Sequence, residues 1–434
     1  MTRPGSKRSL AQSGIGDVSR TRTDPLSWIL GGLISVLILF PSVVEQLLPT
    51  RMALVVVAAL IIGVEGVRER RRGGLLAAIG LFLIGVLVLQ VGSQASDALG
   101  DPMVTTNAQR ILVVLPTMAG LGYTLYKSAR RSSYLRSFVM LAVVVAVLAA
   151  IESLQYGSVL GRDEAFSHLQ REGSARAIVG SEHVLVLGAI LAGSIPLVRS
   201  AEFRYPRAAA VVLLGGVVAT GSRWPTVIAI GLLTVALVPA LGRWIRMRYR
   251  LVRTIAVVTY LALLTAAFFI WKPIATGATG AAYSIEYRFA IYALLPNILE
   301  SVPIGIGFAS IPYGLWLLPS ELFGVRDLAA TVDSEPVYLA VSFGWIGLAA
   351  YVIPLLIATS ALRNSLDAGL SALAITVAGI FLALHAWDSI GPLWYAILGA
   401  CVAAIRWRSE VPYHPNRRSG MDSATAIDPA VPRR

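Results

Sequence analysis

Apolar runs that approach the thickness of a lipid bilayer recur along this chain and constrain its fold more than any other feature. A helix needs about 20 mainly apolar residues to cross the hydrocarbon core of a membrane. The sequence is 56% hydrophobic and only 14% charged, and its mean hydropathy is +0.71. These values predict an all-α polytopic membrane protein.

Twelve apolar runs are predicted as transmembrane helices, with one long polar segment between the ninth and the tenth. The predicted spans are residues 26–44, 52–67, 75–91, 111–126, 138–154, 179–198, 208–219, 226–241, 252–271, 337–357, 370–384 and 390–405. The domain order is therefore an N-terminal tail (1–25), nine spans (26–271), a long loop (272–336), three spans (337–406) and a disordered C-terminal tail (407–434). The loop is rich in aromatic residues, which predicts an ordered segment with short helices.

Lysine and arginine fall mainly in alternate connections, and this asymmetry predicts the orientation. With the N-terminus in the cytoplasm, 28 of the 37 basic residues lie on the cytoplasmic side, as the positive-inside bias requires. Both termini are then cytoplasmic and the long loop is extracytoplasmic. The net charge of +13 is explained by these helix ends, so no nucleic-acid partner is predicted. The single Cys401 excludes an intramolecular disulfide.

Nine basic residues remain on the predicted outer side, and Arg223 is the most informative of them. It lies in a tight turn between two spans, where an unpaired guanidinium is costly unless it lines a wet cavity or binds a ligand. Snorkelling to lipid phosphates is the alternative interpretation. Some of the nine are interpreted as solvated loop charges; the full set is Arg51, Arg110, Arg162, Arg171, Arg176, Arg223, Lys272, Arg288 and Arg326.

Polar side chains gather in four outer connections, which together form the candidate site. The planar fork of arginine suits a diphosphate, and a nearby carboxylate can accept a proton from a hydroxyl. His385 and Asp388 are interpreted mainly as an interfacial turn. The candidate residues from the other connections are Arg171, Arg176, His183, Ser222, Arg223, Tyr287, Arg288, Asp333 and Glu335.

Several short motifs, in order along residues 150–355, are similar to those of the bacterial O-antigen ligase and O-antigen polymerase superfamily. They are Arg176, Gly180 and His183 (with Val184 in place of a proline), Thr220-Gly221-Ser222-Arg223, Tyr287-Arg288, Pro303-Ile304-Gly305-Ile306-Gly307, Asp333-Ser334, Tyr338-Leu339 and Gly344-Trp345-Ile346-Gly347-Leu348. The resemblance implies a metal-independent, cofactor-free glycosyltransferase of the membrane-embedded GT-C type. Its donor would be a polyprenyl-diphosphate-linked oligosaccharide, bound at the outer face of the cytoplasmic membrane.

In this resemblance Arg223 and Arg288 bind the diphosphate and stabilise the charge that grows on the leaving group. An acceptor hydroxyl attacks the anomeric carbon with inversion, and an apolar flank between helices takes the polyprenyl tail. Arg171, Arg176 and His183 serve as further substrate contacts. A chain-length regulator or a flippase is an expected partner.

The chain departs from the ligase pattern just before the tenth span. Ligases of this family carry a histidine there, whereas this sequence reads Val332-Asp333-Ser334-Glu335-Pro336. Aspartate at this place favours a polymerase, whose acceptor is another glycan, over a ligase. Asp333 is predicted as the catalytic base, with a helix N-cap as the alternative. Glu335 is either a substrate contact or a first-turn residue that complements the helix dipole.

Three rival functions remain open at the level of sequence. A transporter or lipid flippase would carry charges near the bilayer midplane and repeats with broken helices. A peptidoglycan polymerase of the shape, elongation, division and sporulation type would use a similar lipid diphosphate donor. A non-enzymatic scaffold would leave the outer arginines without a purpose.

Overall fold

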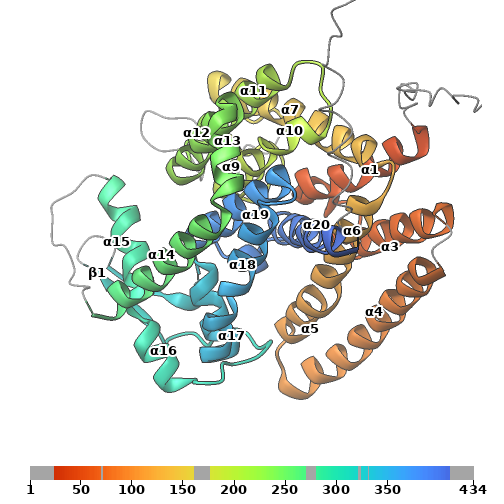
Figure 1. Cartoon of the computed structure of the whole chain (residues 1–434). Helices are drawn as coiled ribbons and strands as arrows, with labels where there is room; N and C mark the ends of the chain where they lie inside the picture. Colours follow the sequence, from red (N-terminus) through yellow and green to blue (C-terminus); the bar gives the residue numbers. More distant parts are fainter. Residues whose placement is uncertain are drawn as a thin grey trace, which may run out of the picture.

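The computed structural model describes residues 24–69, 72–160, 176–269, 280–320, 324–330 and 332–410, and it is almost entirely helical (Figure 1). Each predicted span coincides with a helix or with a pair of helices. The predicted tails lie largely outside the described residues, and so do Arg171 and residues 272–279.

The first part of the described chain forms seven α-helices and one π-helix. They are α1 (Pro25–Leu39), α2 (Pro41–Val44), α3 (Thr50–Arg68), α4 (Arg72–Leu99), α5 (Met103–Gln109), the π-helix η1 (Arg110–Val114), α6 (Leu115–Lys127) and α7 (Arg131–Gln155). The middle part contains α9 (Val184–Ser194), α10 (Leu197–Ser200), α11 (Pro206–Ala219), α12 (Arg223–Leu237), α13 (Pro239–Met247) and α14 (Tyr249–Phe269).

The long loop and the last spans form the rest of the described chain. The loop holds α15 (Gly280–Ala293), α16 (Leu295–Ser301), β1 (Leu317–Ser320), β2 (Gly324–Asp327) and the 3-10 helix η2 (Leu328–Ala330). The final elements are α17 (Glu335–Ala350), α18 (Val352–Ala361), α19 (Leu366–Ala378), the 3-10 helices η3 (Gly379–Phe381) and η4 (Leu384–Ala386), and α20 (Ile390–Glu410).

The prediction of twelve spans is not supported. Among the described helices, four are long and apolar enough to cross a membrane, or five if the bent pair α12–α13 is one span. Breaks in the apolar runs explain the difference. Pro41 follows the end of α1 after 15 residues, and α9 contains only 11 residues, both short of the roughly 20 that a bilayer needs. A membrane protein with several spanning helices is what the structure supports.

The long loop is ordered where it is described, and it contains a small hydrophobic core of its own. Tyr287, Ile291, Trp316 and Leu328 are buried together in it. Besides the expected short helices, the loop forms a two-stranded antiparallel hairpin, β1–β2, which the all-α prediction lacked. Aromatic side chains give this segment enough apolar surface to fold over α17.

Two glycine motifs of the sequence pack against each other at the kink in α17. Gly344 has a φ of 59°, a left-handed conformation that glycine adopts without strain. The turn Pro303–Gly307 docks there, since Trp345 N donates to Pro303 O (3.1 Å) and Gly307 N donates to Ser342 O (2.8 Å). A Cβ on Gly344 would overlap the backbone of Pro303. These glycines therefore hold the loop on α17.

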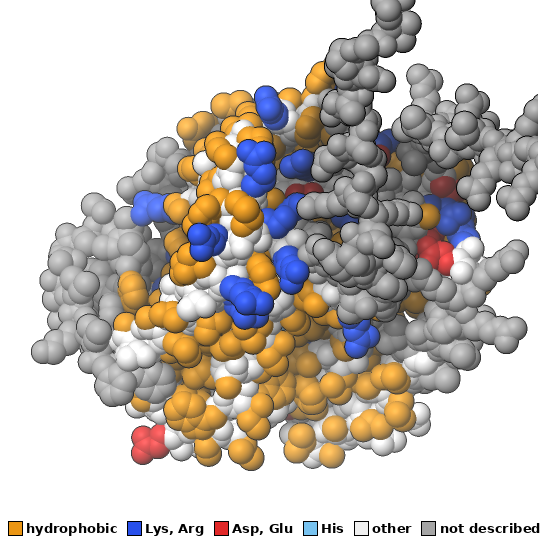
Figure 2. Space-filling model, in the orientation of Figure 1, with side chains coloured by type: hydrophobic (Ala, Val, Ile, Leu, Met, Phe, Trp, Pro, Cys, Tyr) orange, Lys and Arg blue, Asp and Glu red, His pale blue; other side chains and the backbone are white. Residues whose placement is uncertain are grey.

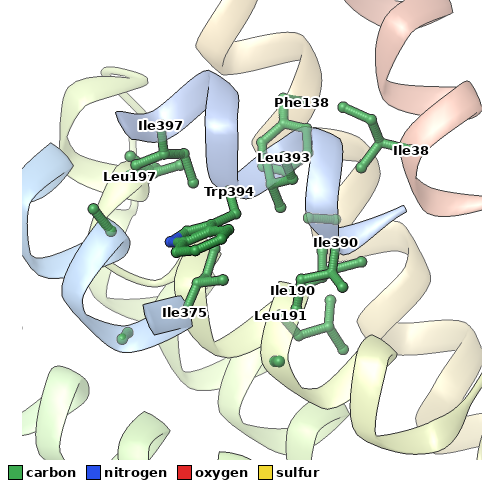
Figure 3. Packing of buried hydrophobic residues seen from close by; sticks show 14 of the residues in the cluster. Ile38, Phe138, Ile190, Leu191, Leu197, Ile375, Ile390, Leu393, Trp394 and Ile397 are labelled. Atoms are coloured by element: carbon green, nitrogen blue, oxygen red, sulfur yellow. The ribbon is translucent and has the colours of Figure 1, made fainter. Parts of the chain in front are cut away.

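A very close contact between helix backbones joins α6 to α20. A Cβ added at Gly122 would overlap the carbonyl group of Ala396, and one at Gly399 would overlap that of Ala119. Small residues let two helix backbones approach in this way, which is how membrane helices gain packing energy. On α20, the side chain of Trp394 is buried, and Figure 3 shows it among packed aliphatic side chains.

Basic side chains gather around α13, which bends by 99° away from α12. Figure 2 shows Lys and Arg over the upper part of this face, whereas hydrophobic side chains cover the lower part around α17. Arg243, Arg246 and Arg248 are exposed here, together with Trp244 and Met247. Exposed arginines beside exposed apolar side chains are typical of a helix that lies along a membrane interface.

We expect the α6–α20 contact to be intolerant of any side chain. Gly122→Ala should lower the free energy of unfolding by about 3 kcal/mol or more, because the obstacle is backbone and cannot move aside. Gly215→Ala is the matched control, since a Cβ there meets nothing within 4 Å. Alanine in the middle of a helix should be neutral or stabilising by up to about 1 kcal/mol. Thermal unfolding of the purified proteins measures both, and equal stability of the two variants would contradict the packing described.

Candidate functional site

The Thr220–Arg223 turn holds Arg176 in place. Gly221 has a φ of 63°, and a Cβ on it would lie 3.1 Å from Arg176 Cγ. Arg176 is buried and its Nε donates to the Thr220 carbonyl oxygen (3.3 Å). A second link is the hydrogen bond from Ala177 N to Ala219 O (3.0 Å). Two of the predicted arginine-bearing segments are therefore in direct contact.

Ser222 and Arg223 have different surroundings although they are neighbours. Ser222 is the buried N-cap of α12, and its hydroxyl donates to the Val184 carbonyl oxygen (3.2 Å). It therefore joins the start of α12 to the start of α9. Arg223 is exposed, and within the part of the chain that the structure describes its side chain makes no hydrogen bond or ion pair. Its guanidinium is available to a ligand.

His183 lies within the electrostatic influence of both Arg176 and Arg288. It is the N-cap of α9, where its Nδ1 accepts a hydrogen bond from Leu185 N (3.2 Å), so the neutral ring carries its proton on Nε2. Its ring stacks on Trp387 with centroids 5.6 Å apart. Burial lowers the pKa of His183 to about 4, and the charges of Arg176 and Arg288 contribute to this shift. His183 is thus a neutral hydrogen-bond donor close to two guanidinium groups.

Phe381 joins the Arg288 side of the site to the Arg223 side. The Arg288 Cζ atom lies 5.5 Å from the centre of the Phe381 ring. Trp224, next to Arg223, packs edge-on against the same ring with centroids 4.9 Å apart, and its Nε1 donates to Val377 O (3.3 Å). Side chains from α12 and α15 therefore meet at η3.

Asp333 is positioned near η3 by the hydrogen bonds of its neighbour Ser334. The Ser334 hydroxyl donates to the Tyr292 hydroxyl (2.9 Å), and Tyr292 in turn donates to the Ile380 carbonyl oxygen (2.9 Å). Tyr292 belongs to α15, which also carries Arg288, and Ile380 belongs to η3. Asp333 itself is partly exposed. Ser334, and not Asp333, occupies the N-cap position of α17, so the N-cap interpretation of Asp333 is wrong.

Two predicted substrate contacts are buried inside the protein. Tyr287 is 5% exposed and belongs to the small core of the loop, with Arg326 Cζ lying 5.7 Å from its ring centre. Glu335 is completely buried and is the first residue of α17, as expected for a residue that complements the helix dipole. Its carboxylate accepts hydrogen bonds from His385 N (3.0 Å) and from His385 Nδ1.

Burial favours the neutral form of His385 in this pair. Burial lowers its pKa to about 3, with a further contribution from Arg110. Because Nδ1 donates to Glu335, Nε2 is left as an acceptor, and it lies 3.2 Å from the Tyr395 hydroxyl. His385 is therefore part of a buried hydrogen-bond network rather than of an exposed interfacial turn.

Asp388 is the centre of a second network, which the sequence did not reveal. Its Oδ1 lies 2.7 Å from Arg51 Nε and 3.4 Å from Arg110 Nη2. Its backbone N and the Ser389 hydroxyl both donate to Glu182, each at 2.9 Å. Burial and the charge of Asp388 raise the pKa of Glu182 to about 7. The sequence offered one sign of this network, because Arg51 and Arg110 lie on the predicted outer side against the positive-inside bias. In the structure both arginines form ion pairs with Asp388 and are not solvated loop charges.

An apolar cavity of about 520 Å³ lies between α6, α17, α18 and α20. Binding sites for small molecules have volumes of about 300–1,000 Å³. Its walls are formed by side chains such as Leu339 and Phe343, and His385 provides polar atoms. The segment from η3 to η4 thus separates two environments, because Phe381 contacts Arg288 whereas His385 lines the cavity.

A scan against protein-family models finds no match to this chain, and searches of curated proteins and of solved structures find none either. The resemblance drawn from the short motifs therefore stays a prediction. Of the residues that it names, Arg176 and Arg288 both act electrostatically on His183. Arg223 and Asp333 are linked to them through their neighbours Trp224 and Ser334.

The pKa of His183 predicts a pH-dependent stability. Between pH 6.5 and about 4 the unfolded chain takes up a proton that the folded chain does not, so the free energy of unfolding should fall as the pH falls. His183→Asn keeps an N-cap side chain but has no imidazole to titrate. We expect wild type to lose up to about 2 kcal/mol more than this variant between about pH 7 and 5. Thermal unfolding at several pH values tests this, and parallel pH curves would refute it.

The Asp388 network should be important for stability. Asp388→Ala leaves the buried Arg110 without its carboxylate, and breaking such a pair costs about 3 kcal/mol. Asp97→Ala removes an exposed carboxylate from α4 and should change stability by less than about 0.5 kcal/mol. Melting temperatures compare the two variants. Equal values would show that the Asp388 network contributes little.

Proposed function

We propose that this chain polymerises polyprenyl-diphosphate-linked glycan repeat units by inverting, metal-independent glycosyl transfer. The observation that carries the proposal is the grouping of Arg176, Arg288 and the Arg223 turn around His183 and Phe381. Several guanidinium groups on one face favour an anionic ligand, and a diphosphate is an anion that several arginine forks can share.

Arg223 and Arg288 act on the diphosphate in this proposal. As the glycosidic bond breaks, negative charge grows on the leaving diphosphate, and fixed guanidinium groups stabilise it without having to reorganise. The N-terminus of α12, which begins at Arg223, adds its partial positive charge. Arg176 is held by the turn and extends the cationic surface. His183 Nε2–H offers one more neutral hydrogen bond.

Asp333 is the proposed base. It is partly exposed, and its position relative to α15 and η3 is fixed through the Ser334–Tyr292–Ile380 hydrogen bonds. A carboxylate there accepts the proton of the acceptor hydroxyl as that oxygen attacks the anomeric carbon. The acceptor is a second glycan, which makes the reaction a polymerisation. Transfer to a different acceptor, as in a ligase, would use the same groups.

The cavity of about 520 Å³ is the proposed site for the polyprenyl tail. Its apolar lining suits an isoprenoid, and its position across η3–η4 from Arg288 suits a ligand with a charged head and a hydrophobic tail. The protein would lie in the bacterial cytoplasmic membrane, with the arginine group on the extracytoplasmic side and both termini in the cytoplasm. The basic surface around α13 (Figure 2) supports this orientation through the positive-inside bias.

Substitution of the proposed diphosphate ligands tests the function. Arg223→Ala and Arg288→Ala should leave the protein folded but lower the rate of glycan extension by about 100-fold or more. Arg223→Lys should also be impaired, because a point charge lacks the planar fork. Arg207→Ala is the matched control, since Arg207 is exposed near the start of α11, the opposite end from the Arg223 turn.

The assay uses purified protein, a polyprenyl-diphosphate-linked oligosaccharide and analysis of product length. Wild-type rates in Arg223→Ala and Arg288→Ala would refute the proposal. Movement of the lipid across a vesicle membrane without any lengthening would instead identify a flippase.

A further inference from the structure

A second apolar cavity lies on the other side of the α6–α20 pair. Its volume is about 120 Å³, and its walls come mainly from α1, α6, α7 and α20. Met118 and Leu121 face it from α6, whereas Ala119 of the same helix lines the larger cavity. Figure 3 shows Ile38 and Phe138, which belong to this lining, close together beside α20. The two cavities are therefore separate sites.

The lining of this cavity includes one cationic side chain, that of Arg131. Arg131, the first residue of α7, is part of the lining. Its Cζ lies 4.4 Å from the centre of the Tyr126 ring, and its Nη2 donates to the Ser200 hydroxyl (3.2 Å). Ser200 in turn donates to Asp367 (2.6 Å). The guanidinium is thus positioned by a ring and a hydroxyl and does not form a direct ion pair with Asp367 in the described structure.

Further positive charge lies at the C-terminal end of α6, close in the chain to Arg131. Lys127 Nζ lies 4.9 Å from the centre of the Tyr123 ring, and Arg406 lies beside the same tyrosine. Both tyrosines, Tyr123 and Tyr126, belong to the last two turns of α6. The combined field of Lys127, Arg131 and Arg406 favours an anion at this end.

We propose that this cavity holds part of one acyl chain of an anionic phospholipid, with the lipid phosphate bound at Arg131. Apolar cavities of about 150 Å³ accept molecules such as benzene, so this one has room for a short segment of an acyl chain. An acyl chain that moves from the bilayer into an apolar cavity gains no hydrophobic free energy, because the surrounding lipid tails are equally apolar. Selectivity must therefore come from the charge-assisted hydrogen bonds of the guanidinium to the phosphate and from the neighbouring cations. This site is independent of the glycan-transfer function proposed above.

Native mass spectrometry of the full-length protein tests the proposal with phosphatidylglycerol and phosphatidylcholine of identical acyl chains. Wild type should bind one phosphatidylglycerol about fivefold or more tightly than phosphatidylcholine, because only the former lipid carries a net negative charge for the cations to attract. Arg131→Gln should remove this preference, whereas Arg136→Gln, on the same helix but outside the lining, should keep it. Ala400→Leu fills the cavity from α20 and should weaken the binding of both lipids.

Equal binding of the two lipids by wild type, or an unchanged preference in Arg131→Gln, would overturn the proposal. If either lining variant fails to fold, a photoreactive acyl chain on phosphatidylglycerol decides the matter in wild-type protein. Cross-links should map to residues 34–38, 118–138 and 393–400, which include most of the lining. Cross-links confined to other helices would overturn the proposal equally.

Discussion

The backbone contact between α6 and α20 is the constraint on which the rest of this structure depends. Glycine at positions 122 and 399 lets each helix meet a carbonyl group of the other, an approach that any side chain would prevent. In a bilayer, where burial of apolar surface gives little net gain, such packing is a main source of helix association. The pair then divides the interior, so that one apolar cavity lies on each side of it.

The candidate site is built from the ends of helices rather than from their middles. His183 lies at the start of α9, Arg223 begins α12, and Asp333 lies just before α17. Short hydrogen-bonded links position these ends, and they run from Ser222 to Val184, from Ser334 to Tyr292, and from Tyr292 to Ile380. The Arg288 side and the Arg223 side of the site meet at Phe381 of η3. Charges at helix ends remain near water, which lowers the cost of keeping several guanidinium groups close together.

The sequence predicted the helices better than it predicted the spans. Apolar runs located nearly every described helix, but they did not show that breaks such as Phe40-Pro41 and the bend at Val238 shorten them. The hairpin β1–β2 was missed because its strands contain only four residues each, too few for a clear alternation of polar and apolar residues.

The positive-inside bias identified individual candidate residues of the site, but it could not identify their partners. It singled out Arg223 and Arg288, and the structure brings Arg288 and the neighbour of Arg223 to the same ring. It could not show that Arg51 meets Asp388, since 337 positions separate the two residues in the sequence. Pairing between distant turns depends on how the helices pack, and a single sequence carries no direct signal of that packing.

The bend between α12 and α13 separates Arg223 from the cationic helix α13. An amphipathic cationic helix such as α13 settles among lipid headgroups, and α12 rises from it for 15 residues, which is roughly 22 Å at about 1.5 Å per residue. The hydrocarbon core is about 30 Å thick. Arg223 and the cations of α13 thus lie at opposite ends of a helix that is shorter than the hydrocarbon core is thick, and Arg223 remains exposed at its end.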